Sequence, residues 1–180
     1  KYLSLRTALE LALKHLNINK ENRYYLKKKY PTFITIPIFG QKKIKKIIYK
    51  FKNVNFIKVK VNKKNILKTI KFINKNCPKS KIIIDANEGL NFNLLKKIIK
   101  NLERLNVIII EQPFKYGLDY KLKYIKTKIL FCADESFHLN NKNKVLKYYQ
   151  LINIKLDKFG GLNKSLNIIK FLRKKNKKIL

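Results

Sequence analysis

From residue 32 onward, short apolar runs alternate with longer segments of mixed polarity. Six runs have the length and apolar content of β-strands: 32–38, 56–61, 81–85, 107–111, 129–134 and 151–156. The segments that follow them have the apolar spacing of helices: roughly 41–52, 63–76, 92–105, 119–126, 140–149 and 163–175. Strands that alternate with helices favour a parallel sheet covered by helices, so the sequence predicts an α/β fold. A closed barrel and an open doubly wound sheet share this pattern.

A different pattern precedes these repeats. Residues 2–16 place apolar side chains at helical spacing, and a polar stretch over 17–31 ends at a proline. We therefore expect residues 1–30 to form the end of a helical domain with its linker, and residues 31–180 to form the α/β domain. The chain lacks Met and is short for a complete barrel, which needs roughly 250 residues, so we expect an internal piece of a longer protein.

Carboxylates stand at the ends of three successive predicted strands. The runs KIIID, NVIIIE and KILFCAD end in Asp85, Glu111 and Asp134, in a chain with only 10 acidic residues. Strand ends converge on one mouth in a barrel, whereas the outer strands of an open sheet lie too far from a single site. Three carboxylates at one mouth predict an Mg2+ site, because Mg2+ prefers hard oxygen ligands. The alternative is that each carboxylate caps the helix after its strand.

Lysines occupy the ends of two further predicted strands. Lys58 and Lys60 lie two apart in FIKVKV and so point to one face, and Lys155 ends LINIK. Two ammonium groups inside a barrel are costly unless an anion pairs with them, and crowding should lower the pKa of one lysine enough to make it a base. Two lysines on opposite sides of a substrate carbon would invert its configuration. The alternative is a solvent-facing strand in a Lys-rich chain.

These residues together resemble the enolase superfamily, in the subgroup typified by muconate lactonizing enzymes. The matching pieces, in chain order, are KVK at 58–60, DAN at 85–87, EQP at 111–113, ADES at 133–136 and NIKLDKFGG at 153–161. The resemblance covers almost the whole chain and implies a TIM-like (β/α)7β barrel, of which about six βα units are present. Residues 4–16 resemble the last helix of the α+β capping domain of that family.

The resemblance also implies a role for each charged residue at the strand ends. It implies that Asp85, Glu111 and Asp134 are the Mg2+ ligands. It further implies that Lys60 and Lys155 are the two acid/base groups of a 1,1-proton transfer, which passes through an enediolate that the metal stabilises.

Four more positions receive supporting roles from the resemblance. Lys58 would tune its neighbouring lysine and contact the substrate carboxylate, and Thr35 would approach the substrate. Asn87 and Glu135 would lie beside the metal ligands. His138 follows the third carboxylate, and its simplest interpretation from sequence is a surface-loop position.

The closest resemblance within the subgroup is to epimerases of Ala-Glu dipeptides, through the first strand and through D-A-N-x-G and N-I-K-L. Glu88, Leu90 and Asp157 depart from that pattern. We expect a small carboxylate substrate, with a dipeptide such as L-Ala-L/D-Glu as the first interpretation. The alternatives are a lyase or cycloisomerase of the o-succinylbenzoate synthase or muconate cycloisomerase type, an inactive remnant, and a basic nucleic-acid-binding protein.

Composition favours the enzyme over the nucleic-acid-binding protein. The net charge of +34 comes mainly from Lys, and only four Arg are present, although Arg is the residue that reads bases bidentately. Lys, Asn, Ile, Phe and Tyr are abundant together, as A/T-rich codons would produce. The two isolated cysteines fit a reducing compartment, and no apolar run approaches the length of a membrane span. We therefore expect a cytoplasmic protein without membrane contact, compatible with a homo-oligomer.

Overall fold

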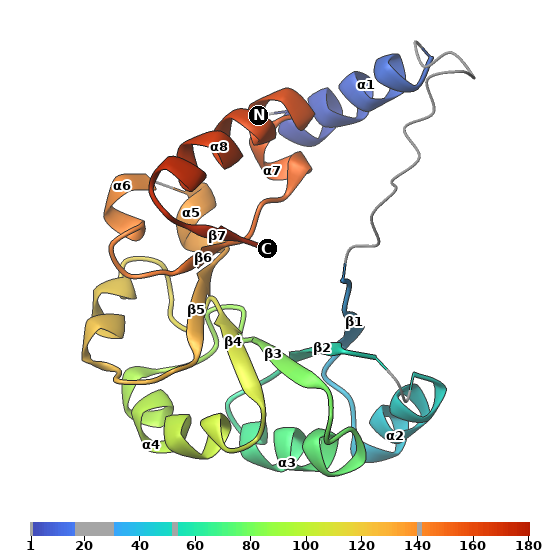
Figure 1. Ribbon diagram of the computed structural model, residues 1–180, viewed down its shortest axis with the longest axis vertical. Helices are drawn as coiled ribbons and strands as arrows, with labels where there is room; N and C mark the ends of the chain where they lie inside the picture. The colour runs from blue at the N-terminus through green and yellow to red at the C-terminus, as the bar shows by residue number, and fades with distance from the viewer. Residues whose placement is uncertain (1, 17–30, 52–53, 140–141) are drawn as a thin grey trace. The chain divides into compact units, whose positions relative to one another are not determined.

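A computed structural model describes residues 2–16, 31–51, 54–139 and 142–180 (Figure 1). These residues form two compact units. The larger unit comprises residues 31–150, and the smaller unit contains the first helix, α1 (Leu3–Leu16), together with residues 151–180. The predicted linker falls on residues 17–30, which lie outside the described residues, so the division into two domains near residue 30 stays a prediction.

The larger unit is built on five parallel strands that pair in chain order. The strands are β1 (Ile34–Ile36), β2 (Phe56–Lys60), β3 (Lys81–Asp85), β4 (Val107–Glu111) and β5 (Leu130–Ala133). Successive strands are connected by α2 (Gln41–Lys50), α3 (Ile66–Asn76), α4 (Phe92–Glu103) and the 3-10 helix η2 (Asp119–Tyr124). The chain then continues through α5 (Glu135–Leu139) and α6 (Lys142–Val145). Parallel strands separated by helical connections confirm the predicted α/β class.

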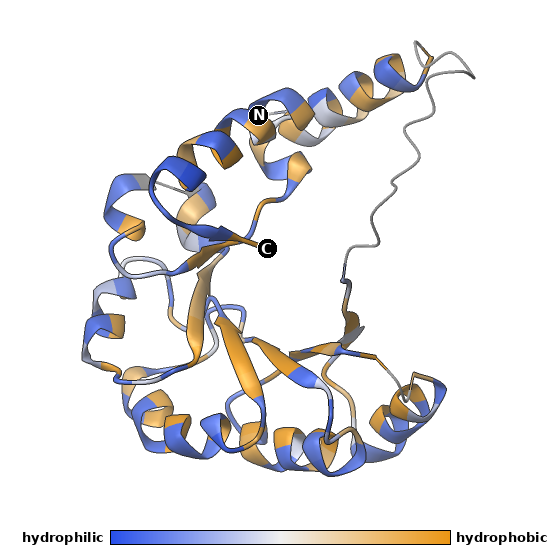
Figure 2. Cartoon of the chain, viewed as in Figure 1, coloured by the Kyte–Doolittle hydropathy of each residue, from blue (hydrophilic) through white to orange (hydrophobic). Residues whose placement is uncertain are grey.

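A row of apolar side chains runs across all five strands and forms the centre of the core. The pairing register aligns Ile36, Val59, Ile84, Ile110 and Phe131. Each of these side chains is at most 3% exposed, and the helices α2, α3 and α4 contribute further buried isoleucines and leucines. Figure 2 shows the strands as mainly hydrophobic and the helices as mixed, as expected when each helix buries one stripe.

A β-bulge in β4 sets the register between β3 and β4. Ile82 pairs with Val107, but the next residue, Ile83, pairs with Ile109, so Ile108 is an extra residue in β4. Side chains along a strand alternate between the two faces of the sheet. The extra residue therefore moves each later side chain of β4 to the face opposite the one that it would occupy without the bulge. As a result Glu111 pairs with Asp85, and both carboxylates lie on the face opposite the apolar row.

The C-terminal end of α4 is tied to the segment before β5 by one carboxylate. Glu103 accepts hydrogen bonds from the Thr127 hydroxyl at 2.6 Å and from the Lys128 N–H at 2.9 Å. Its second oxygen lies 3.1 Å from the Lys100 ammonium. These three donors, led by the Thr127 hydroxyl, hold the pKa of Glu103 at about 2, below that of an ordinary glutamate.

The smaller unit combines helices with a short parallel strand pair. It contains α1, β6 (Leu151–Ile152), α7 (Leu156–Phe159), α8 (Leu162–Lys174) and β7 (Lys178–Ile179), with β6 parallel to β7. The Thr7 hydroxyl of α1 donates to the Leu156 carbonyl at 3.0 Å, and Glu10 accepts from the Asn163 N–H at 3.1 Å. Gly160 has a φ of +73°, a backbone conformation that residues with a side chain rarely adopt, so glycine is favoured at this position.

The structure differs from the sequence prediction after each of the last two predicted strands. A helix, α5, begins directly after β5, and the helix predicted over 140–149 is reduced to α6 and a turn, with residues 140–141 outside the described residues. The strand predicted to reach residue 156 ends at Ile152, because Leu156 already begins α7. A seventh strand, β7, was not predicted. No helix in the described ranges is both long and apolar enough to span a membrane.

Candidate active site

Charged residues line the face of the larger unit that is opposite the apolar row. One register row places Thr35 beside Lys58, and the row two residues further along places Lys60, Asp85 and Glu111 side by side. Lys58, Lys60, Asp85 and Glu111 were predicted from strand alternation and strand ends, and Thr35 was predicted from the family resemblance. Because parallel strands all end at the same edge, their carboxyl ends deliver these groups to one region.

Lys58, Asp85 and Glu111 form a buried charge cluster. The Lys58 ammonium lies 2.6 Å from Glu111 Oε2 and 3.2 Å from Asp85 Oδ2. The three side chains are 10%, 0% and 6% exposed, respectively. Burial of a charge is costly unless it is paired, and here two carboxylates pair with one ammonium, which leaves net negative charge.

The same cluster keeps Lys58 protonated. Burial favours the neutral amine, but the hydrogen bond and charge of Glu111, followed by those of Asp85, outweigh burial and raise the pKa of Lys58 above its ordinary value. The expectation that crowding of two lysines would lower a pKa is therefore wrong for Lys58. Lys60, the second lysine of the motif, shares a register row with Asp85 but is exposed, and it forms no salt bridge within the described part of the chain.

Asp134 lies one step further along the same face. Glu111 pairs with Cys132, and Asp134 follows Cys132 by two residues, directly after the end of β5. Its Oδ1 lies 2.8 Å from Nε2 of His138, which is on α5 and only 10% exposed. The surface-loop interpretation of His138 is therefore wrong, because the helix that begins at Glu135 turns His138 back over Asp134 within one turn.

The cluster has donors suited to a hard cation, although the three predicted ligands do not meet at one point. Among the described residues, no group of three His, Cys, Asp or Glu side chains lies close enough together to hold a metal ion. Asp85 Oδ1, however, is buried and accepts no hydrogen bond from any described residue. A buried carboxylate oxygen without a donor, beside a second carboxylate, fits a cation such as Mg2+, which prefers carboxylate and water oxygens.

The loop after β3 is held against the segment after β4. Glu88 donates its N–H to the Gln112 carbonyl at 2.8 Å, and its Oε1 accepts from the Tyr116 N–H at 2.7 Å. Asn87 is exposed and adopts a φ of +42°, a conformation that Asn tolerates better than most residues. Glu135 begins α5 and is half-buried. Glu88, which departs from the Ala-Glu epimerase pattern, thus has a structural contact that fixes this loop.

Lys155 belongs to the smaller unit. It follows β6 by three residues and occupies the N-cap position of α7 with extended backbone angles. Its side chain is half-buried, and the preceding Asn153 is 9% exposed.

One residue beside the cluster was missed by the sequence reasoning. Gln112 is fully buried, and its Oε1 accepts the backbone N–H of Asp134 at 3.1 Å and that of Ser136 at 3.0 Å. Its position within EQP, directly after a predicted ligand, was visible in the sequence. Its contact with the next strand was not, because that contact depends on how β4 and β5 pair.

Comparison with known proteins identifies the family to which this chain belongs. The family model described as "Enolase C-terminal domain-like" matches residues 47–179. An N-acetyl-D-glutamate racemase from Pseudoalteromonas sp is 36% identical over 135 residues, which is 74% of this chain and 43% of that protein. The L-Ala-D/L-Glu epimerase of Escherichia coli (strain K12) is 36% identical over 111 residues, or 61% of this chain and 35% of that protein.

A solved structure extends the similarity over nearly the whole chain. An enolase family member from Agrobacterium tumefaciens, with homology to dipeptide epimerases and with bound sodium and L-Ala-L-Glu, superposes with a TM-score of 0.81 at 28% identity. The match covers 97% of this chain and 56% of that one. These similarities confirm the predicted family resemblance and fold class. The chain spans less than half the length of the two curated relatives named above.

Proposed function

This chain belongs to the enolase C-terminal domain-like family, and from that premise we propose that its protein is an Mg2+-dependent epimerase. The reaction removes the α-proton of a small carboxylate substrate and returns a proton to the opposite side. The observation that carries the proposal is the buried cluster of Lys58, Asp85 and Glu111 at the carboxyl ends of adjacent parallel strands, with Lys60 exposed beside it.

The two lysines of KVK would have different roles in binding and catalysis. Lys58 is fixed between two carboxylates and its pKa is raised, so it serves as a permanent positive charge that can attract a substrate carboxylate. Lys60 shares a register row with Asp85 but is exposed, and it would act as one acid/base. Thr35, in the same row as Lys58, is exposed and available to contact substrate.

Lys155 would be the second acid/base group. This assignment rests on its place in N-I-K-L and on its position shortly after β6. In each turnover one lysine, as the free amine, takes the α-proton, and the other, as the ammonium ion, gives a proton to the opposite side of the same carbon. The reaction passes through an enediolate, and the product leaves with inverted configuration at the α-carbon. Proton exchange with water then returns both lysines to their starting protonation states.

Asp85, Glu111 and Asp134 would hold Mg2+, with Asn87 and Glu135 beside them. The unpartnered Asp85 Oδ1 and the surplus negative charge of the cluster support this assignment. When bound, the cation supplies positive charge that stabilises the negative charge developing on the substrate carboxylate. The carboxylates of the chain fix where that charge is placed.

The names of two relatives narrow the substrate class. One relative acts on N-acetylglutamate and another on L-Ala-D/L-Glu, and both substrates are glutamates whose α-amino group is acylated. We propose an N-acylated glutamate as the substrate class, with L-Ala-L/D-Glu as the first candidate and N-acetylglutamate as the second. In both, the acidic C–H lies between a carboxylate and an amide nitrogen.

The test is solvent exchange on the full protein that carries this chain. It is incubated in D2O with Mg2+ and, separately, with L-Ala-L-Glu, N-acetyl-D-glutamate and an unacylated glutamate control. Mass and configuration are followed with and without EDTA. We expect a gain of one dalton together with inversion for at least one acylated substrate, and loss of both with EDTA. Absence of exchange with every acylated glutamate, in folded protein that binds Mg2+, would contradict an epimerase and favour a lyase or an inactive protein.

A further inference from the structure

The buried amide of Gln112 has all of its hydrogen-bonding groups engaged. Its Oε1 accepts two backbone N–H groups, those of Asp134 and Ser136. Its Nε2 donates to the Phe114 carbonyl at 2.9 Å and to the Ser136 hydroxyl oxygen at 2.7 Å. The Phe114 carbonyl can only accept and the two N–H groups can only donate, so the amide has one allowed orientation.

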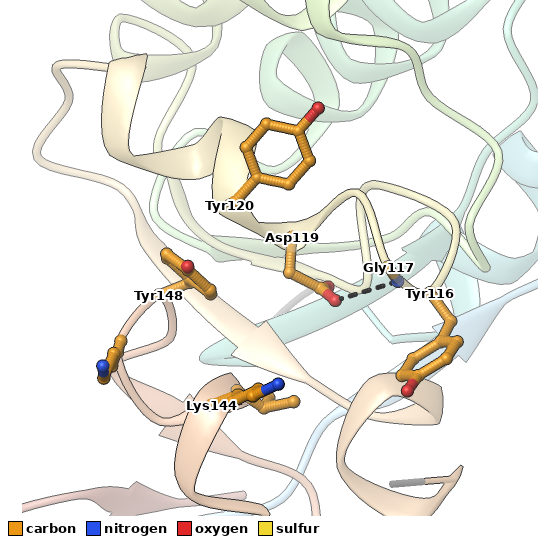
Figure 3. A pocket seen from close by; sticks show the side chains of 8 residues that line it. Tyr116, Gly117, Asp119, Tyr120, Lys144 and Tyr148 are labelled. Carbon is orange, nitrogen blue, oxygen red and sulfur yellow. Dashed lines mark hydrogen bonds between the residues drawn. The ribbon is translucent and has the colours of Figure 1, made fainter. Parts of the chain in front are cut away.

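A second layer of buried groups fixes Ser136. The Ser136 hydroxyl donates to Asp119 Oδ1 at 2.7 Å, and the Tyr149 hydroxyl donates to the same oxygen at 2.6 Å. The other oxygen of Asp119 accepts from the Gly117 N–H at 3.3 Å, at the edge of a cavity of about 340 Å3 (Figure 3). Burial and then the Asp119 charge raise the pKa of Tyr149, so it remains a donor.

This network connects two of the proposed metal ligands. Gln112 directly follows Glu111, the last residue of β4, and its side chain crosses to the turn between β5 and α5, where it holds the N–H groups on either side of Glu135. The amide therefore fixes the backbone from which the Asp134 carboxylate projects. Groups that orient ligands in this way typically change metal affinity when they are removed.

We propose that Gln112 is a positioning residue that sets the Asp134 carboxylate relative to Glu111, with Ser136, Asp119 and Tyr149 holding its amide in place. The proposal deepens the proposed function and rests on the Mg2+ site which that function includes, with Asp134 as one of the ligands. An apolar side chain of similar size would leave the Phe114 carbonyl and two N–H groups buried without partners. These buried polar groups therefore have hydrogen-bond partners only while Gln112 is present.

The test measures Mn2+ affinity of the full protein by electron paramagnetic resonance of free Mn2+, a measurement independent of turnover. Gln112→Met should weaken affinity by about 10- to 100-fold. Ser136→Ala, which removes only the hydroxyl between the amide and Asp119, should weaken it by a smaller factor. The matched control is Ser165→Ala: Ser165 is equally buried, and its hydroxyl bonds the Gly161 carbonyl in the smaller unit. It should lower the melting temperature and leave Mn2+ affinity unchanged.

The outcomes separate this inference from the proposed function. If Gln112→Met does not fold, Ser136→Ala against Ser165→Ala decides the question alone. Wild-type Mn2+ affinity in folded Gln112→Met or Ser136→Ala, with epimerase activity in the wild type, overturns the positioning role and leaves the function standing. Weakened affinity in these variants, with no epimerase activity in the wild type, supports the positioning role and overturns the function. A wild type that binds no Mn2+ overturns both.

Discussion

Replacing Lys58 by methionine removes the only described cation of the buried cluster while keeping most of the side-chain volume. At an effective dielectric constant of about 20, contacts of 2.6 and 3.2 Å correspond to gross attractions of about 6 and 5 kcal/mol. The desolvation of three buried charges offsets much of this sum. Because Glu111 and Asp85 would remain buried without their partner, we expect Lys58→Met to lower the free energy of unfolding by about 3–5 kcal/mol in the absence of divalent metal.

The assay is urea unfolding of the full protein with EDTA, followed by circular dichroism, with Lys60→Met as the matched control. Lys60 lies on the same strand but is exposed, so its replacement should change stability by no more than about 0.5 kcal/mol. Equal losses of stability in the two variants would refute the reasoning.

Three further predictions follow from individual side chains. Lys60→Ala and Lys155→Ala should each reduce epimer formation to background in the D2O assay, with exchange at most on one side of the carbon; full activity in the double variant would contradict a two-lysine mechanism. Asp134→Asn should weaken Mg2+ binding by at least about 10-fold in calorimetric titration, and unchanged affinity would remove Asp134 from the metal site. Glu103 has a folded pKa of about 2, below the unfolded value, so its charge stabilises the fold above the unfolded pKa and the stabilisation is lost as pH falls toward 2. The stability difference between wild type and Glu103→Gln, measured by urea unfolding, should therefore close between about pH 5 and pH 2, and a constant difference would show that the carboxylate charge contributes nothing.

Local patterns predicted the order of strands and helices well where each element buries one side. The strands at 81–85 and 107–111 were predicted with the observed bounds, because isoleucine runs between polar residues give a strong signal. The prediction was weakest after β5 and β6, where four- and five-residue helices follow the strands without a full apolar period. The seventh strand was missed because only two of its residues pair.

The site was predictable in its residue types and less so in its contacts. The sequence placed Asp85, Glu111 and Lys58 at strand ends, and the structure brings these three together. His138 was assigned to a surface loop, because nothing in the sequence shows that α5 starts early enough to turn it toward Asp134. The buried roles of Asp119 and Tyr149 had no sequence signal, since their partners lie 17 and 30 residues apart along the chain.

The sequence by itself determined which groups each strand end carries and which face each would take within its own strand. Alternation along a strand is a local property, so Lys58 and Lys60 had to share a face. Only the tertiary structure decided how neighbouring strands align. The extra residue Ile108 brings Glu111 level with Asp85, whereas Asp134 stays one row beyond them. Register depends on hydrogen bonds between strands that are distant in sequence, and a shift of one residue reverses the face of every side chain after it.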